Sequence, residues 1–230
     1  EKEIIAFHEA GHAVVMHFLP NADPVHKVSI ISRGMALGYT MPLPEEDRHL
    51  FSRSKFTSDL AGLLGGRAAE ELHIGDVTPG AGNDLERATL LARKMVTEYG
   101  MSEKLGPRTY GRKEELVFLG KEIAEQRNYG DRVADLIDEE IKGLIERCYQ
   151  TARGIVTEQR PKLDRLARRL IEVETLEGDE LGKLFQEEEE AQPAPEAAPA
   201  QKARSRQKPA AEPETKAGEV AQKPAFQPAT

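Results

Sequence analysis

The stretch His8-Glu9-Ala10-Gly11-His12 constrains this chain most, because it sets two metal-binding side chains at a fixed spacing. Residues four apart on an α-helix lie on one face, about one turn from each other. The imidazoles of His8 and His12 can therefore bind a single metal ion. Glu9 lies beside them and can reach a water held by that ion. The pattern predicts a metal site that makes a hydrolytic nucleophile from water at neutral pH.

The surrounding residues predict a helix over residues 1–19. Ile4, His8, Gly11, Val15 and Phe18 recur at helical spacing, and Pro20 ends the pattern. Glycine lowers helix stability by about 1 kcal/mol relative to alanine. Gly11 has two explanations that sequence leaves open: close approach of another backbone, or simple tolerance.

Composition excludes several classes of protein. The net charge is −8, which argues against a nucleic-acid partner, because phosphate contacts need clustered lysines and arginines. Cys148 is the only cysteine, so neither an intrachain disulfide nor a thiolate zinc cluster can form. No apolar run has membrane-spanning length and no phosphate-binding G-x-x-x-x-G-K-[ST] loop is present. The chain starts without Met and already in helical register, so we expect a fragment of a longer protein.

Two short stretches predict a small β-hairpin. Residues 25–32 are rich in β-branched side chains, and residues 39–43 form the returning strand. Pro42 confines the second strand to an edge or an end of a sheet. An exposed edge can bind an extended peptide through backbone hydrogen bonds, although an ordinary hairpin has the same pattern.

The remaining pattern predicts a mainly α-helical fold. Apolar periodicity indicates helices over residues 52–64, 67–72, 84–99, 131–152 and 161–171, and a last short one starting at Thr175 or Asp179. We expect Ser52 or Ser54 to cap the first of these, Gly65-Gly66 to interrupt it, and Asp131 to cap the long one.

The composition changes from about Ala191. Residues 191–230 hold seven of the fourteen prolines and almost no large apolar side chains, so we expect a disordered tail. The predicted organisation is one folded domain over residues 1–188, which holds the metal site, followed by a tail over residues 189–230. Within the domain, residues 1–118 form the metal-site core and residues 119–188 a helical bundle.

The motif supplies only two of the three protein ligands that a catalytic zinc needs. The extended motif of metzincins would require a glycine at 15 and a histidine at 18, where this chain has Val15 and Phe18. His17 faces away from His8 on the helix. The other histidines, at 26, 49 and 73, have no spacing signal. Spacing alone leaves three carboxylates as candidates for the third ligand: Glu70, Glu71 and Asp84. Asp84 also fits an ordinary N-cap, the commoner role at such a position.

A family resemblance covers residues 1 to about 188. The chain resembles the peptidase domain of FtsH-type proteases, which are membrane-anchored, ATP-dependent zinc metalloproteases of the AAA+ class. Five stretches carry this likeness beyond the H-E-x-x-H motif: Arg33–Thr40, Leu64–Glu71, Gly80–Thr89, Met101–Pro107 and Val117–Ile123. Ser32 stands where the family has a proline.

The resemblance implies that Asp84 is the third ligand, so that His8, His12 and Asp84 hold one zinc ion per chain and Glu9 is the base. It also implies a hexameric ring and unfolded protein substrates that lie beside a strand near Gly38-Tyr39-Thr40. The ATPase module and the membrane anchor, which would hold the protein at the cytoplasmic side of the membrane, would belong to a longer protein. Two other functions remain open: a structural zinc-binding or oligomerisation module, and a stand-alone peptidase that needs no ATPase.

Overall fold

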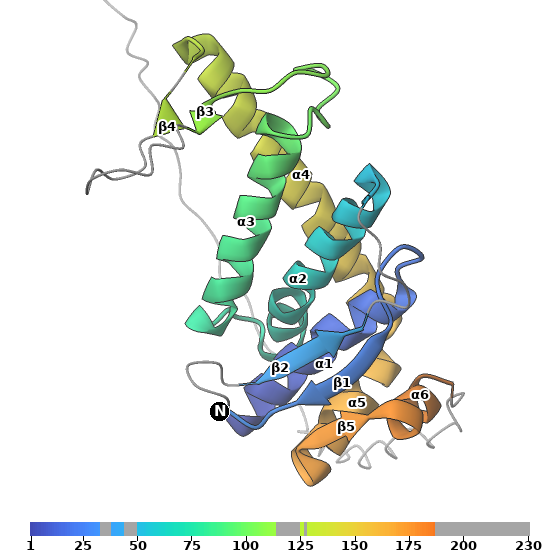
Figure 1. Ribbon diagram of the computed structural model, residues 1–230. Coiled ribbons are helices and arrows are strands. Elements are labelled where there is room, and N and C mark those ends of the chain that lie inside the picture. The colour runs from blue at the N-terminus through green and yellow to red at the C-terminus, as the bar shows by residue number, and fades with distance from the viewer. Residues whose placement is uncertain (33–37, 44–49, 114–124, 127, 187–230) are drawn as a thin grey trace, which may run out of the picture. The chain divides into compact units, whose positions relative to one another are not determined.

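The computed structural model describes residues 1–32, 38–43, 50–113, 125–126 and 128–186. The predicted turn near Arg33-Gly34, His49 and the predicted disorder of the tail lie outside this part. Figure 1 shows its elements in chain order: α1 (Lys2–Phe18), β1 (Val25–Ser29), β2 (Tyr39–Pro42), α2 (Arg53–Ile74), the 3-10 turn η1 (Pro79–Ala81), α3 (Gly82–Thr97), β3 (Arg112–Lys113), β4 (Glu125–Gln126), α4 (Asp131–Glu158), α5 (Arg160–Val173), β5 (Thr175–Glu177) and α6 (Gly178–Gln186).

The described residues are mainly α-helical, as the sequence predicts, and α1 is the central helix. Residues 6–15 of α1 are all buried, because α1 packs against α2, α4 and α5 and carries the sheet on another side (Figure 1). No described helix combines the length and the apolar character that crossing a lipid bilayer requires.

The hairpin prediction is confirmed, and a third strand joins it. β1 pairs antiparallel with β2 on one side and with β5 on the other, so β2 lies at an edge of the sheet. Pro42 is the last residue of β2, where its missing N–H disturbs the ladder least. β5 was not predicted, because three residues are too short for a period-two pattern. Of the two helix starts expected here, Thr175 is wrong, since it lies in β5, and α6 starts at Gly178, next to Asp179.

The expected interruption of α2 at Gly65-Gly66 is wrong. α2 runs without a break from Arg53 to Ile74, with Ser52 as its N-cap. The glycines serve packing instead: a Cβ on Gly65 would lie 2.8 Å from the carbonyl oxygen of Gly11, and one on Gly11 would lie 2.5 Å from that of Gly65. The backbones of α1 and α2 therefore touch, which identifies close approach as the reason for Gly11.

Two expected helix starts are also wrong in detail. The residue that caps α4 is Gly130, and Asp131 is the first helical residue. α3 starts at Gly82, directly after η1, so Asp84 is the third residue of the helix and not its cap. The turn η1 begins after Thr78 and leads directly into α3, so α3 starts two residues earlier in the chain than the sequence predicts. Asp84 is therefore available for another role.

We predict that Gly65→Ala destabilises the protein by about 1–3 kcal/mol, because the added methyl forces α1 and α2 apart. Gly154→Ala is the matched control: Gly154 lies inside α4, and its added Cβ meets nothing within 4 Å. Alanine there should stabilise the protein by up to about 1 kcal/mol through helix propensity. Urea unfolding followed by circular dichroism measures both changes. An unfolding midpoint for Gly65→Ala at or above that of the parent would contradict this view of the helix contact.

Candidate metal centre

Three side chains converge at the middle of α1. The Nε2 atoms of His8 and His12 lie 3.0 Å apart, and Oδ2 of Asp84 lies 3.3 Å from each of them. Tetrahedral zinc with bonds of about 2.0–2.1 Å separates its ligand atoms by about 3.3 Å. The two nitrogens and the oxygen therefore have the chemistry and the spacing of a zinc site.

Each histidine is held by its other ring nitrogen. Nδ1 of His12 lies 2.8 Å from the carbonyl oxygen of Gly62, which can only accept, so Nδ1 carries the proton and Nε2 is left for a metal. Nδ1 of His8 lies 2.6 Å from Oε1 of Glu70. Gly66 leaves room for both rings, since a Cβ there would lie 2.6 Å from atoms of each.

The three carboxylates that spacing left open occupy different places. Asp84 faces the two Nε2 atoms. Glu70 lies behind His8, only 2% exposed, and its second oxygen accepts a hydrogen bond from the backbone N–H of Thr78 at 2.9 Å. Glu71 points elsewhere and accepts a hydrogen bond from the hydroxyl of Tyr149 on α4. Among the described residues, Asp84 alone joins the two histidines in one ligand cluster.

The charges of the cluster favour ionised carboxylates. Burial acts to raise the pKa of Asp84, but the neighbouring His12 and His8 side chains outweigh burial and hold the pKa well below its usual range. Burial likewise opposes ionisation of Glu70, yet hydrogen bonds from His8 and Thr78 lower its pKa. Burial lowers the pKa of His8, and Asp84 and Glu70 together raise it to about 9. An anionic pocket of this kind favours a cation.

Glu9 is buried beside the cluster and is held by the edge strand. The hydroxyl of Thr40 on β2 donates to Oε2 of Glu9 at 2.8 Å and also lies 3.1 Å from the backbone oxygen of Glu9. Gly38 lies against the carboxylate, because a Cβ there would lie 2.7 Å from Oε1. Burial raises the pKa of Glu9, against the opposing effects of His12 and Thr40. A carboxylate with a raised pKa is suited to accept and return a proton.

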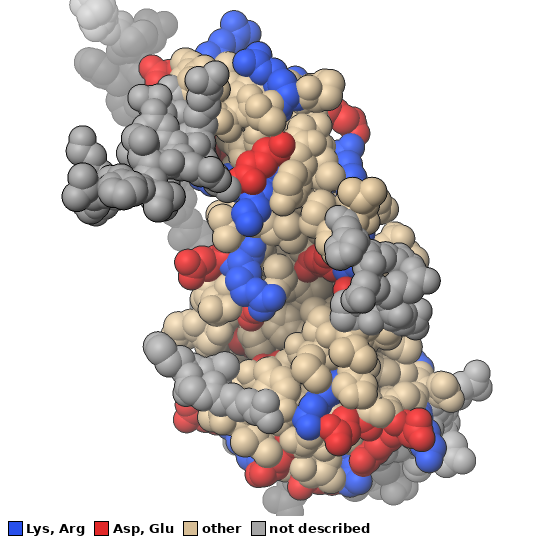
Figure 2. All heavy atoms as spheres, in the orientation of Figure 1, with Lys and Arg blue, Asp and Glu red and all other residues tan. Residues whose placement is uncertain are grey.

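The cluster opens into a cleft of about 840 Å³. Figure 2 shows this side of the molecule hollowed between the region of β2 and the N-terminal part of α3. Residues 39, 40 and 42 form one wall, the segment from Thr78 to Arg87 forms the facing wall, and His8, Glu9 and His12 lie between them. The candidate ligands are therefore accessible to a chain that lies along β2.

The remaining described histidines take no part in the cluster. The His17 ring stacks on Phe185 of α6, with centroids 4.0 Å apart, and the His73 ring stacks on Phe7, with centroids 3.5 Å apart. His26 is exposed on β1. The sequence alone indicated neither Glu70 as the partner of His8 nor Thr40 as the partner of Glu9. Glu70 was considered only as a metal ligand and not as the hydrogen-bond partner of one. Thr40 had no signal beyond its place in a strand.

Comparison with known proteins identifies a family. Residues 1–184 match the family described as Peptidase family M41. Three similar proteins are an ATP-dependent zinc metalloprotease FtsH 1 of Thermomicrobium roseum (57% identity over 85% of this chain and 30% of that protein), an ATP-dependent zinc metalloprotease FtsH of Thermotoga maritima (56%, 82% and 31%), and an ATP-dependent zinc metalloprotease FtsH 1 of Sphaerobacter thermophilus (57%, 81% and 29%).

This chain thus spans less than a third of the length of these relatives. The family match nevertheless covers nearly all described residues, including His8, His12 and Asp84 and both walls of the cleft. The chain belongs to peptidase family M41 and is a peptidase domain of the type found in the ATP-dependent zinc metalloproteases named FtsH.

Proposed function

We propose that this chain hydrolyses peptide bonds in unfolded proteins, with one zinc ion held by His8, His12 and Asp84. The observation that carries the proposal is the convergence of these three ligand atoms beside the buried carboxylate of Glu9 in an open cleft. Three protein ligands leave a fourth position for water or substrate, which is the arrangement of catalytic rather than structural zinc sites. This favours an enzyme over a structural zinc module.

Different side chains and one carbonyl of the protein have different roles in the proposed hydrolysis. When bound, zinc supplies Lewis acidity that makes water a nucleophile near neutral pH and polarises a peptide carbonyl. Glu9 accepts the proton of the attacking water on its carboxylate and then passes it to the leaving amine. Thr40 keeps that carboxylate in place through its hydrogen bond to Oε2. Glu70 and the carbonyl oxygen of Gly62 hold the histidines in the tautomer that leaves Nε2 for the metal.

Substrate binds in this proposal as an extended strand along β2. β2 is an edge strand, and its residues line the cleft beside Glu9. Backbone pairing at an edge depends little on side chains, so a wide range of unfolded sequences fits. In a folded protein most backbone groups are already paired, so few segments can bind in this way.

The larger assembly is proposed from the similar proteins. Their names describe ATP-dependent proteases, so we infer that an ATPase module of a longer protein unfolds substrates and delivers them to this cleft. The resemblance supports a homo-hexamer and a membrane anchor that holds the protein at the cytoplasmic side. The proposed peptidase unit comprises residues 1–188, a range that contains the family match to residues 1–184.

Zinc affinity should distinguish the three carboxylates. Asp84→Ala removes a proposed ligand and should weaken zinc binding more than about 100-fold. Glu70→Gln disturbs the partner of His8, and losses at such positions are about 10–100-fold. Glu71→Gln is the control and should bind zinc like the parent, since Glu71 faces Tyr149. Competition with a chelating indicator measures all three, and metal analysis of the parent should give one zinc per chain. Parent-like affinity in Asp84→Ala would remove Asp84 from the site.

Glu9→Gln should keep zinc and lose cleavage. Glutamine preserves the shape of Glu9 but cannot take a proton from water, and general-base catalysis contributes about 10²–10⁴-fold. The measurement pairs metal content with the rate of casein cleavage in the same preparation. Undiminished cleavage by a zinc-loaded Glu9→Gln variant would refute the proposed mechanism.

Dependence on an ATPase module should follow the state of the substrate. We expect this chain alone to cleave a short unstructured peptide and to leave a stably folded protein intact. Gel electrophoresis of digests of one protein, in its native form and in a permanently unfolded variant, makes the comparison. Rapid digestion of the native form by this chain would instead favour a stand-alone peptidase.

A further inference from the structure

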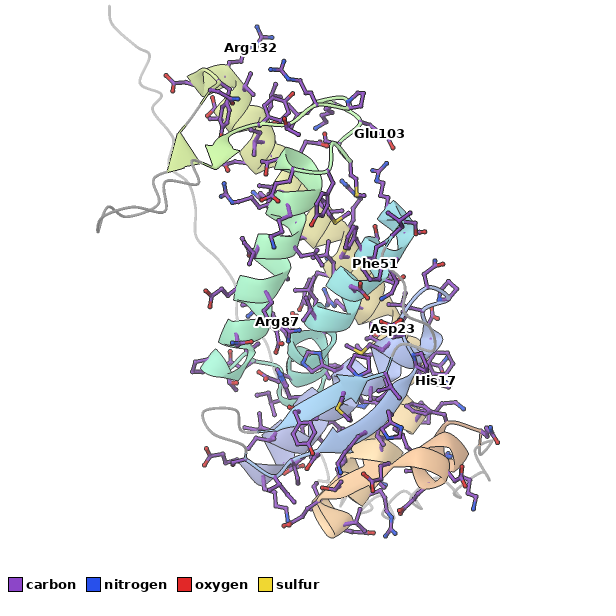
Figure 3. The ribbon with its side chains drawn as sticks, viewed as in Figure 1. His17, Asp23, Phe51, Arg87, Glu103 and Arg132 are labelled. Carbon is purple, nitrogen blue, oxygen red and sulfur yellow. The ribbon has the colours of Figure 1, made fainter. Side chains whose placement is uncertain are left out.

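One arginine lies among the acidic groups of the cleft. Arg87 is the only lysine or arginine among the described residues that line it, whereas Glu1, Glu9, Glu70 and Asp84 contribute four carboxylates. The Arg87 side chain is 65% exposed, and its only charged partner in the described part of the chain is Oδ1 of Asp84, at 3.7 Å. That distance exceeds a hydrogen bond, so the guanidinium N–H groups remain available to a ligand. Figure 3 places Arg87 near the N-terminal end of α3.

A strand bound along β2 has a second edge that β2 cannot satisfy. In an extended peptide, backbone groups point to both sides, and only one side pairs with the edge strand. The other side would face the opposite wall of the cleft, where Asn83, Asp84 and Arg87 lie. Asp84 is already directed at the histidines. Asn83 and Arg87 are four residues apart on α3, so they share a face of the helix.

We propose that Arg87 is a substrate-binding residue whose guanidinium donates hydrogen bonds to main-chain carbonyl oxygens on the substrate edge that faces away from β2. Asn83 supports it with an amide that can both donate and accept. The carboxylates of the cleft would repel an acidic side chain, so neutral carbonyl oxygens are the acceptors that suit this cation. This inference rests on the proposed function and adds a second set of hydrogen bonds to the substrate main chain, opposite the edge strand.

The test measures peptide binding separately from cleavage. The probe is a fluorescent, unstructured peptide without Asp or Glu and with an amidated C-terminus, so that it offers Arg87 no carboxylate. The peptide is titrated against the zinc-loaded chain carrying Glu9→Gln, and anisotropy gives the Kd. Adding Arg87→Ala should raise the Kd about 10-fold, as expected for loss of a charge-assisted hydrogen bond. Arg87→Lys, which keeps the charge, should fall between the two.

Two controls separate binding from other effects. Arg93→Ala removes a cation six residues further along α3, turned by about 120° from Arg87 and outside the cleft, and should leave the Kd unchanged. Zinc affinity should be equal in Arg87→Ala and the parent. In the active chain, Arg87→Ala should act mainly on KM.

An unchanged peptide Kd in Arg87→Ala would overturn the inference. A fall in zinc affinity that accounts for the weaker peptide binding would overturn it as well, because Arg87 would then act by orienting Asp84. Failure of the proposed function looks different: the zinc-loaded parent would not cleave the peptide at all, whatever residue 87 is.

Discussion

The site depends on the two hydrogen bonds of the Glu70 carboxylate. The carboxylate is buried on α2, and a buried charge is stable only when its oxygens are paired. One oxygen binds Nδ1 of His8 on α1, and the other accepts the N–H of Thr78 at the turn that leads into α3. Thr78 also caps η1, from which α3 and Asp84 follow directly. One side chain thus links the two halves of a cluster whose members lie 76 residues apart in the chain.

The contact between α1 and α2 makes that arrangement possible. Gly11 faces Gly65 with no side chain between the backbones, and Gly66 lies against the rings of His8 and His12. Each glycine weakens an isolated helix by about 1 kcal/mol, yet tertiary packing stabilises helices in proteins more than propensity does. Gly65 and Gly66 locally favour a break in α2, yet they are the residues that let α2 approach His8 and His12.

The sheet contributes one side chain that contacts the proposed base, the hydroxyl of Thr40. Thr40 lies on the edge strand and holds the carboxylate of Glu9, so the position of the proposed base and the position of the substrate edge are set by the same four-residue strand. β5 pairs with the opposite side of β1 and so leaves β2 at the edge. Glu9 is thereby held from two sides, by its own helix and by the strand along which we propose that substrate lies.

The local sequence determined those elements that have a regular apolar spacing or a residue of restricted chemistry, such as proline. The H-E-x-x-H spacing in an amphipathic pattern predicted α1 and the pairing of His8 with His12. Pro42 confined the second strand to an edge or an end of its sheet, and β2 has both properties. Spacing could not choose among Glu70, Glu71 and Asp84; family resemblance favoured Asp84, and the fold brings Asp84 to the two histidines. The continuity of α2, the strand β5 and the roles of Glu70 and Thr40 were decided by tertiary structure alone. The physical reason is that each depends on a partner distant in the chain: a helix that glycines can approach, a strand that three residues can join, or a buried group that needs a hydrogen bond.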